Sequence, residues 1–194
     1  MRDDPYWNHN TQYHPWLLAQ IPGTARTVLD IGCGDGLLAT KFGRRGLTVR
    51  GVDLDPAILD TATPTPNVTF EHGDFLDLPG TFDLVTSVAT LHHVPLRDGL
   101  TALRRLVAPG GTLAVVGLWK FDPRTDYPYL ALLPAIIAID TLHRPKLGGP
   151  DMRLRDPETT FPEIRTAAAE ILPGAHLRRR PLLRYTLLWH KPAE

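Results

Sequence analysis

Apolar residues recur along the chain with two alternating periods, one typical of strands and one typical of helices. Short apolar or alternating runs predict strands at residues 28–31, 47–53, 67–71, 82–88 and 112–118. Leu96, Leu100, Leu103 and Val107 are spaced by four, three and four residues, which indicates an amphipathic helix. This succession of strand and helix predicts right-handed βαβ units and a parallel sheet with helices on both faces.

Turn and capping residues separate these predicted elements. The helix after the first strand is expected to end at Gly46. Asp55 followed by Pro56 fits the N-cap and first position of the next helix. A Pro-Gly-Gly turn at 109–111 is expected before the fifth strand.

The last part of the chain follows a different pattern. Residues 160–163 read Thr-Phe-Pro-Glu, a capping box, and the helix that follows is expected to end at Pro173-Gly174. Residues 176–183 and 185–191 predict two strands with almost no connection, so we expect an antiparallel pair at the sheet edge. Three arginines at 178–180 lie there, and a solvated edge that resists aggregation explains them better than a binding patch.

The chain of 194 residues is long enough for one α/β domain and short for two. We therefore expect a single domain over residues 1–194, with a cap segment at 1–20 and an insertion or lid at 120–155. The apolar block Leu130–Ile139 predicts a helix, packed either as a lid over the ligand crevice or as part of the core.

Composition narrows the choice of partners. Lysine and arginine number 21, as do aspartate and glutamate, so the zero net charge gives no general attraction to nucleic acid or an anionic membrane. The single cysteine, Cys33, cannot form an intramolecular disulfide. No secretory h-region is visible, and the apolar run at 130–139 is too short to span a bilayer. We expect a cytoplasmic protein that binds neither nucleic acid nor membrane.

The strongest chemical signal is the stretch Val28–Gly36, which reads Val-Leu-Asp-Ile-Gly-Cys-Gly-Asp-Gly. Its glycines, Gly32, Gly34 and Gly36, follow a strand and open a helix. Backbone N–H groups there favour an anionic group, and missing Cβ atoms let a ligand contact the chain. The spacing is G-x-G-x-G, whereas dinucleotide-binding enzymes usually show G-x-G-x-x-G, and the sequence contains no P-loop motif.

Three aspartates follow three successive predicted strands, at the edge where the carboxyl ends of parallel strands meet. Asp53 can accept hydrogen bonds from both hydroxyls of a ribose. Asp74 can accept one from an exocyclic amine of adenine, with Phe75 or Leu54 packed on the ring. Asp30 can meet an ammonium group directly or through the glycine turn. A helix cap explains any one of these acids as well, but all three beside the glycines indicate a nucleotide-like ligand.

Five segments together resemble the successive motifs of class I S-adenosylmethionine-dependent methyltransferases, at Val28–Gly36, Val49–Pro56, Gly73–Pro79, Phe82–Val94 and Leu103–Leu118. The resemblance is closest to the small-molecule type with a Leu-His-His motif. It implies a Rossmann-like, three-layer α/β/α fold whose doubly wound seven-stranded sheet has the order 3-2-1-4-5-7-6, with the last strand antiparallel. It also implies S-adenosyl-L-methionine as methyl donor and S-adenosyl-L-homocysteine as product.

The resemblance also assigns cofactor-binding residues. Gly32, Gly34 and Gly36 would line the methionine end, with Cys33 between them as a small residue rather than a nucleophile. The backbone of Val88 would lie near the methionine ammonium. The ribose and adenine roles of the two later aspartates agree with the family pattern.

In the same architecture, the segment after the fourth strand faces the transferable methyl group, and this chain has His92 and His93 there. One of them can act as general base for an O–H or N–H nucleophile. Alternatively, both shape the pocket or cap the next helix. The N-terminal segment is expected to fold over the cofactor, with Tyr13, or else His14, at its carboxylate. Equally, the aromatic residues of that segment can fix a helix to the sheet.

Ala89-Thr90 stands where metal-dependent methyltransferases need carboxylates, so we expect no metal. DNA amino-methyltransferases carry an Asp/Asn-Pro-Pro-aromatic tetrad at the same position, and this chain lacks it. The leading hypothesis is methylation of a small, largely apolar acceptor in specialised metabolism, at oxygen rather than nitrogen or carbon, by a monomer or homodimer.

The sequence is also compatible with two other functions. A protein of this fold can bind the cofactor without methyl transfer, as a cyclase or a binding module. A nicotinamide-dependent oxidoreductase is the third hypothesis, and the glycine spacing argues against it. The segments expected to choose the acceptor, 1–20 and 120–155, carry no transferable motif.

Overall fold

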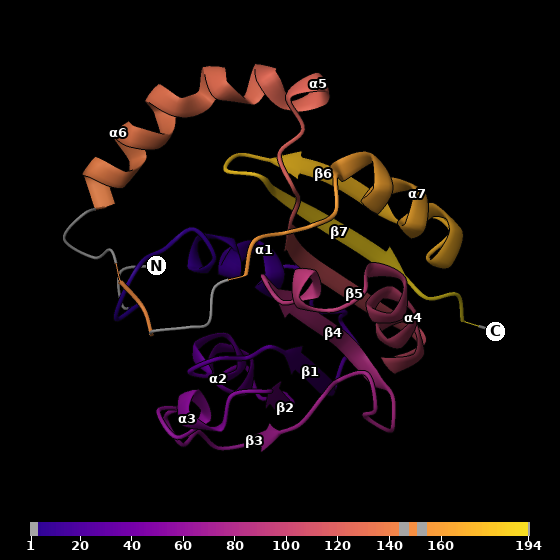
Figure 1. Ribbon diagram of the computed structural model, residues 1–194. Coiled ribbons are helices and arrows are strands. Elements are labelled where there is room, and N and C mark those ends of the chain that lie inside the picture. Colours follow the sequence, from indigo (N-terminus) through magenta and orange to yellow (C-terminus); the bar gives the residue numbers. More distant parts are fainter. Residues whose placement is uncertain (1–3, 144–147, 151–154, 194) are drawn as a thin grey trace.

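The computed structural model describes residues 4–143, 148–150 and 155–193. Its centre is a seven-stranded sheet with the order β3-β2-β1-β4-β5-β7-β6, which confirms the predicted fold (Figure 1). The strands are β1 (Thr27–Ile31), β2 (Thr48–Asp53), β3 (Val68–His72), β4 (Phe82–Val88), β5 (Val107–Leu118), β6 (His176–Arg180) and β7 (Arg184–His190). The first five strands are parallel, and β7 runs antiparallel to both β5 and β6.

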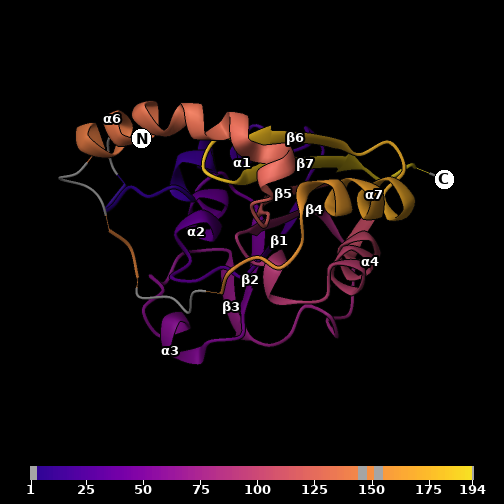
Figure 2. The same cartoon turned by 45° about the horizontal axis from the view of Figure 1, so that its top comes forward.

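Helices cover both faces of the sheet (Figures 1 and 2). They are η1 (Thr11–Tyr13), α1 (His14–Leu18), α2 (Leu37–Gly43), α3 (Pro56–Leu59), η2 (Leu91–His93), α4 (Leu96–Leu106), α5 (Pro123–Asp126), η3 (Tyr127–Leu132), α6 (Leu133–His143) and α7 (Phe161–Ile171). Along β5, Ala114 and Val116 pack with α1 and α2, whereas Leu113 and Val115 pack with α4 and α7. Because successive side chains point to opposite faces, both faces of the strand are buried by helices. The ends of the strands are therefore the part of the sheet that helices leave uncovered.

The predicted turn at 109–111 is wrong. β5 begins at Val107 and continues through these residues. A register shift against Phe82 and Leu84 of β4 accommodates the irregular stretch, and Gly110 takes a left-handed φ of 74°. The bulge therefore replaces a turn because the flanking residues still pair with β4.

The predicted antiparallel pair at the C-terminal edge is confirmed, but its first strand is shorter than expected. β6 ends at Arg180, and residues 181–183 connect it to β7. Leu182 and Leu183 adopt φ values of 63° and 54°, a left-handed conformation that is costly for branched side chains. The capping box at 160–163 is confirmed at the start of α7.

The apolar block at 130–139 forms η3 and the first part of α6, as its sequence predicts. Figures 1 and 2 show α6 standing away from the sheet. Ile137 is 59% exposed and Ile139 is 41% exposed, which contradicts the alternative that this block belongs to the core. Within the described residues, no helix is long and apolar enough to cross a membrane.

Candidate functional site

The glycine turn between β1 and α2 lies at the carboxyl end of β1. Gly32, Gly34 and Gly36 have left-handed φ values of 66°, 55° and 75°. Gly32 N–H donates to Val52 O at 2.8 Å, which ties the turn to β2. A Cβ atom added to Gly32 would lie 1.9 Å from Oγ1 of Thr90. The fold therefore requires glycine at this position for two reasons, conformation and space.

Asp53 lies at the end of β2, beside this turn. One of its carboxylate oxygens accepts a hydrogen bond from Gly34 N–H at 2.9 Å, and the other accepts one from Asp55 N–H at 3.0 Å. Each oxygen can accept a second bond. The carboxylate is thus held in place by backbone donors and keeps acceptor capacity for a ligand.

A cavity of about 300 Å³ opens in front of Asp53. Its wall brings together several of the residues expected from the sequence, namely Gly32, Asp53, Leu54, Phe75 and His93. Phe75 is buried, whereas Leu54 is 56% exposed at the rim. This volume is at the lower end of the range for small-molecule sites, roughly 300–1,000 Å³.

Asp74 is not among the residues that line this cavity, although its neighbours Gly73 and Phe75 are. Its Oδ1 accepts a hydrogen bond from Leu76 N–H at 2.9 Å. The structure thus gives Asp74 a turn-capping bond, and its role toward an adenine amine stays a prediction.

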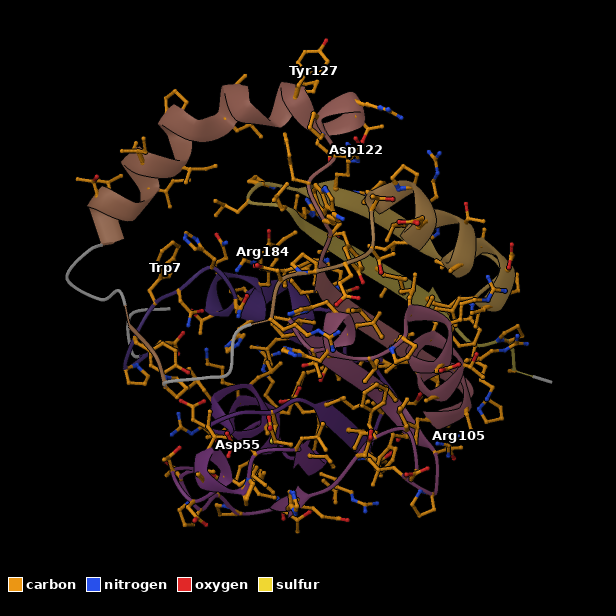
Figure 3. All side chains as sticks on the ribbon, in the orientation of Figure 1. Trp7, Asp55, Arg105, Asp122, Tyr127 and Arg184 are labelled. Atoms are coloured by element: carbon orange, nitrogen blue, oxygen red, sulfur yellow. The ribbon has the colours of Figure 1, made fainter. Side chains whose placement is uncertain are left out.

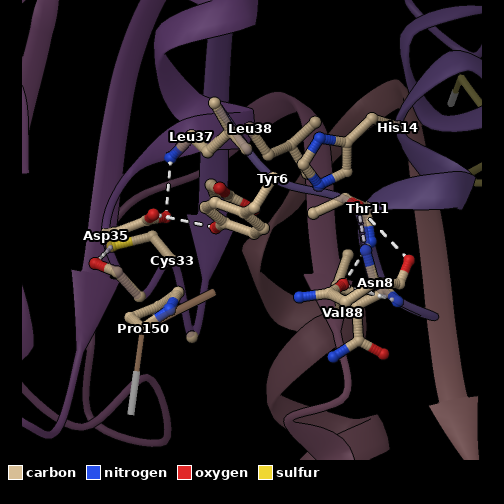
Figure 4. A pocket seen from close by; sticks show the side chains of 14 residues that line it. Tyr6, Asn8, Thr11, His14, Cys33, Asp35, Leu37, Leu38, Val88 and Pro150 are labelled. Atoms are coloured by element: carbon tan, nitrogen blue, oxygen red, sulfur yellow. Dashed lines mark hydrogen bonds between the residues drawn. The ribbon is translucent and has the colours of Figure 1, made fainter. Parts of the chain in front are cut away.

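A second, narrower cavity of about 60 Å³ also borders the glycine turn (Figure 4). Among the described residues, Gly32 alone lines both cavities. The smaller cavity is lined by Asp30, Cys33, Gly34 and Val88, all expected from the sequence, together with residues of the N-terminal segment. Cys33 is buried, and burial raises the pKa of its thiol well above the ordinary range, so the thiol is inert at neutral pH.

Asp30 is the buried acid of the smaller cavity. Its Oδ1 accepts a hydrogen bond from Thr86 Oγ1 at 2.8 Å. Its Oδ2 is buried without a hydrogen-bond partner in the described part of the chain. Burial raises the pKa of this carboxyl to about 7. A buried carboxyl oxygen without a donor is costly, and a cationic donor in the cavity would remove that cost.

The N-terminal segment covers the smaller cavity, but not with the expected tyrosine. Tyr13 lines neither cavity and packs against the core beside α1 and α2. Tyr6 lines the smaller cavity instead, and its hydroxyl donates to Asp35 Oδ2 at 2.8 Å (Figure 4). Asp35 Oδ1 in turn accepts from Leu37 N–H at 3.2 Å, so the start of α2 already has an anionic group.

Sequence reasoning missed Tyr6 and Asp35. Both carry a usable signal, since Tyr6 opens the aromatic segment and Asp35 stands between two of the glycines. His14, the second candidate of the segment, does line the smaller cavity. Its Nδ1 lies 2.9 Å from Lys41 Nζ, and burial together with that ammonium lowers the pKa of His14 to about 3.

His92 and His93 lie in η2, directly after β4. Their ring centroids are 4.2 Å apart. His93 lines the larger cavity, whereas His92 lines neither and its buried Nδ1 has no partner in the described part of the chain. Burial, and then the neighbouring His93, lower the pKa of His92 to about 4, and burial also lowers the pKa of His93. Both rings are therefore neutral at pH 7 and able to accept a proton.

Comparison with known proteins gives matches over most of the chain. The family described as "Methyltransferase domain" matches residues 28–111. An uncharacterized methyltransferase of Mycobacterium bovis is 35% identical over 196 residues, covering 97% of this chain and 99% of that protein. A ubiquinone biosynthesis O-methyltransferase of Paracidovorax citrulli is 28% identical over 202 residues, covering 92% of this chain and 82% of that protein.

Solved structures give the same fold. The magnesium protoporphyrin IX methyltransferase of Synechocystis PCC 6803, solved with bound S-adenosylhomocysteine, matches with a TM-score of 0.61 and 20% identity. The match covers 93% of this chain and 81% of that chain. An O-methyltransferase family protein of Burkholderia thailandensis matches with a TM-score of 0.59 and 25% identity, over 94% of this chain and 57% of that chain.

Proposed function

The chain belongs to the class I S-adenosylmethionine-dependent methyltransferases, and we propose that it methylates an oxygen atom of a small, largely apolar acceptor. The observation that carries the proposal is the position of Gly32, which lines both the larger and the narrower cavity. Two cavities that share one glycine suit a ligand that has an adenosine part and an amino-acid part. Bound S-adenosylmethionine supplies an activated methyl group on its sulfonium.

The residues around the two cavities fit this cofactor. Asp53 keeps acceptor capacity for ribose hydroxyls, and Phe75 offers a buried ring beside Leu54 for adenine. The unpaired Oδ2 of Asp30 suits the ammonium group of the methionine part. In the N-terminal segment, Tyr6 is the tyrosine that we assign to cover this part of the cofactor, because it lines the narrower cavity.

The chemistry asks little of the protein beyond positioning and exclusion of water, because the methyl group arrives activated. A hydroxyl acceptor must lose its proton, and His93 is our candidate for the base because it lines the larger cavity as a neutral ring. His92 packs against that ring and is assigned a positioning role.

Oxygen is favoured as the nucleophile by the names of two similar proteins. The relative from Paracidovorax citrulli is a ubiquinone biosynthesis O-methyltransferase, and the structure from Burkholderia thailandensis is an O-methyltransferase family protein. An apolar acceptor is supported by α6, which leaves the apolar side chains of Ile137 and Leu142 exposed.

Two measurements test the proposal. Calorimetric titration is expected to detect S-adenosylhomocysteine binding and no NAD binding, and the opposite result would exclude the proposed cofactor. Incubation with methyl-labelled S-adenosylmethionine and a panel of small hydroxyl compounds is expected to transfer label to oxygen. Cofactor binding with no transfer to any hydroxyl, amine or carbon acceptor would support a binding module or cyclase instead.

A further inference from the structure

Two arginines meet at the end of the β6–β7 hairpin. Arg180 and Arg184 are directly opposite each other in the antiparallel register, so their side chains project from the same face. Like charges in such a pair destabilise the sheet. The pair therefore calls for either an acidic partner in the protein or an anion from outside.

No acidic partner is present in the described part of the chain, where both side chains bond only to neutral groups. Arg184 donates from Nε and Nη2 to Asn10 Oδ1 at 3.2 and 3.1 Å, and from Nη1 to Leu182 O at 3.1 Å. Arg180 donates from Nε to Thr186 Oγ1 at 3.1 Å. Their neighbour Arg179 differs, because its Nη1 lies 2.8 Å from the buried carboxylate of Asp126.

The pair lies at the edge of the sheet where the candidate site is. Arg184 is in register with Leu118, the last residue of β5, and its partner Asn10 lines the narrower cavity. Figure 3 shows Arg184 beside α1, on the side of the molecule over which α6 extends. The guanidinium is close enough to contribute to the lowered pKa of His92, and burial lowers the pKa of Arg184 itself.

We propose that Arg180 and Arg184 bind an oxyanion, a carboxylate or a phosphate, carried by the methyl acceptor. The proposal rests on the proposed function, because it assigns a group to the acceptor. An arginine fork binds such a planar or tetrahedral oxyanion through two parallel N–H···O bonds. The acceptor would then combine an apolar body with one anionic end.

Binding of simple probes to the full chain tests this site without knowledge of the acceptor. Benzoate, uncharged benzamide of nearly the same shape, and inorganic phosphate are titrated by NMR, with and without S-adenosylhomocysteine. Wild-type protein is expected to bind benzoate or phosphate about tenfold more tightly than benzamide. Preference for phosphate over benzoate, or the reverse, identifies which oxyanion the acceptor carries.

Arg184→Gln and Arg180→Gln are each expected to weaken oxyanion binding about tenfold and to leave S-adenosylhomocysteine affinity within about twofold. Arg178→Gln is the matched control, because it removes the same charge from an exposed position of the same strand. In the absence of an anion, Arg180→Gln is also expected to unfold at an equal or higher temperature than wild type, since it removes the like-charge pair.

Three results would overturn the assignment. In the first, benzoate and phosphate bind no more tightly than benzamide. In the second, Arg178→Gln weakens oxyanion binding as much as Arg184→Gln does. In the third, the arginine variants lose affinity for S-adenosylhomocysteine but keep oxyanion binding. That result would mean that the arginine pair binds the carboxylate of the cofactor rather than the acceptor. If wild type binds the oxyanions but not S-adenosylhomocysteine, the proposed function fails and the anion site stands.

Discussion

The region proposed to bind the methyl donor, at the glycine turn and Asp53, and the region proposed to bind the acceptor, at α6 and the arginine pair, are held in different ways; we call them the donor side and the acceptor side. On the donor side, main-chain groups fix the geometry, since Gly32 N–H bonds to Val52 O and Gly34 N–H bonds to Asp53. On the acceptor side, α6 exposes Ile137, and Arg184 bonds only to neutral groups in the described part of the chain. A site built from the main chain tolerates few substitutions, whereas one built from side chains can change its ligand without disturbing the fold.

Gly32→Ala is expected to give the largest effect on the donor side. The new methyl group would lie 1.9 Å from Thr90 Oγ1 on a backbone with φ of 66°. Strain and overpacking of about 4 kcal/mol together would weaken S-adenosylhomocysteine binding about 1,000-fold, measured by calorimetry. Gly23→Ala is the control, because a Cβ there meets nothing within 4 Å. Affinity within tenfold of wild type would show that the turn is less constrained than its geometry indicates.

Asp30→Asn is expected to separate stability from binding. The pKa of Asp30 is about 7 in the folded protein and 3.8 when unperturbed, so the folded state binds the extra proton between these values. Stability therefore falls as pH rises from about 4 to 7, by about 4 kcal/mol in total.

At pH 8, Asp30→Asn is accordingly expected to raise the free energy of unfolding, measured with urea, and to flatten its pH dependence. The same variant is expected to weaken S-adenosylhomocysteine binding, because it lacks the negative charge for the ammonium. A fall in stability at pH 8 would contradict the burial argument, and unchanged affinity would contradict the assigned role.

His93→Asn is expected to lower kcat about 100-fold with a hydroxyl acceptor found by screening, if the ring is the general base. Because burial lowers the pKa of His93, the wild-type rate is expected to fall only at pH values below the ordinary histidine range. The control is His72→Asn, at the exposed end of β3. A near-normal rate for the His93 variant would remove the base role and leave a pocket-shaping one.

Asp53→Asn is expected to weaken S-adenosylhomocysteine binding about twentyfold, because charge-assisted bonds to the ribose become neutral ones. The amide oxygen can still accept from Gly34 N–H, so the glycine turn is expected to keep its conformation, although the amide nitrogen cannot replace the acceptor for Asp55 N–H. Asp122→Asn, which changes the cap of α5 and lines neither cavity, is the matched control. Equal losses in the two variants would indicate a structural effect rather than a ligand contact.

Ile137→Gln in α6 is expected to give the smallest effect on stability. Its side chain is 59% exposed, so the free energy of unfolding is expected to change by no more than about 0.5 kcal/mol. Leu103→Ala, at a fully buried position of α4, is expected to cost about 2–5 kcal/mol in the same urea titration. A loss above about 2 kcal/mol for the α6 variant would show that this helix packs against the domain or a second copy.

The donor side could be predicted from the sequence because its constraints are local. A glycine turn after a buried strand leaves few conformations, and Asp53 had to follow the next strand. The N-terminal contact could not be predicted in the same way. Choosing Tyr6 over Tyr13 depends on the path of the segment across the sheet, which no periodicity encodes. Asp74 was placed at the correct edge, but its bond to Leu76 N–H depends on the turn that follows.

In the C-terminal hairpin, the strands could be predicted from the sequence, but the separate surroundings of the arginines could not. The sequence indicated two antiparallel strands, and the run of arginines was interpreted as a solvated edge. The three arginines in fact have different surroundings, because successive residues of a strand project from opposite faces, which separates Arg179 from Arg178 and Arg180. Arg179 reaches the buried carboxylate of Asp126, whereas Arg180 faces Arg184 across the hairpin. These partners are distant in sequence, so only the register of β6 against β7 separates the roles.

The insertion of β7 between β5 and β6 also has a consequence for synthesis. β7 ends at residue 190 and pairs with β5 over seven residue pairs, Thr112 to Leu118. A chain still on the ribosome can assemble the parallel half of the sheet around β1 and β4, but β5 keeps a bare edge until the last strand emerges. The arginine pair is completed at that same moment. The glycine turn and Asp53 thus lie on strands that are made early, whereas the arginine pair that we propose to bind the acceptor cannot form before β7 is made.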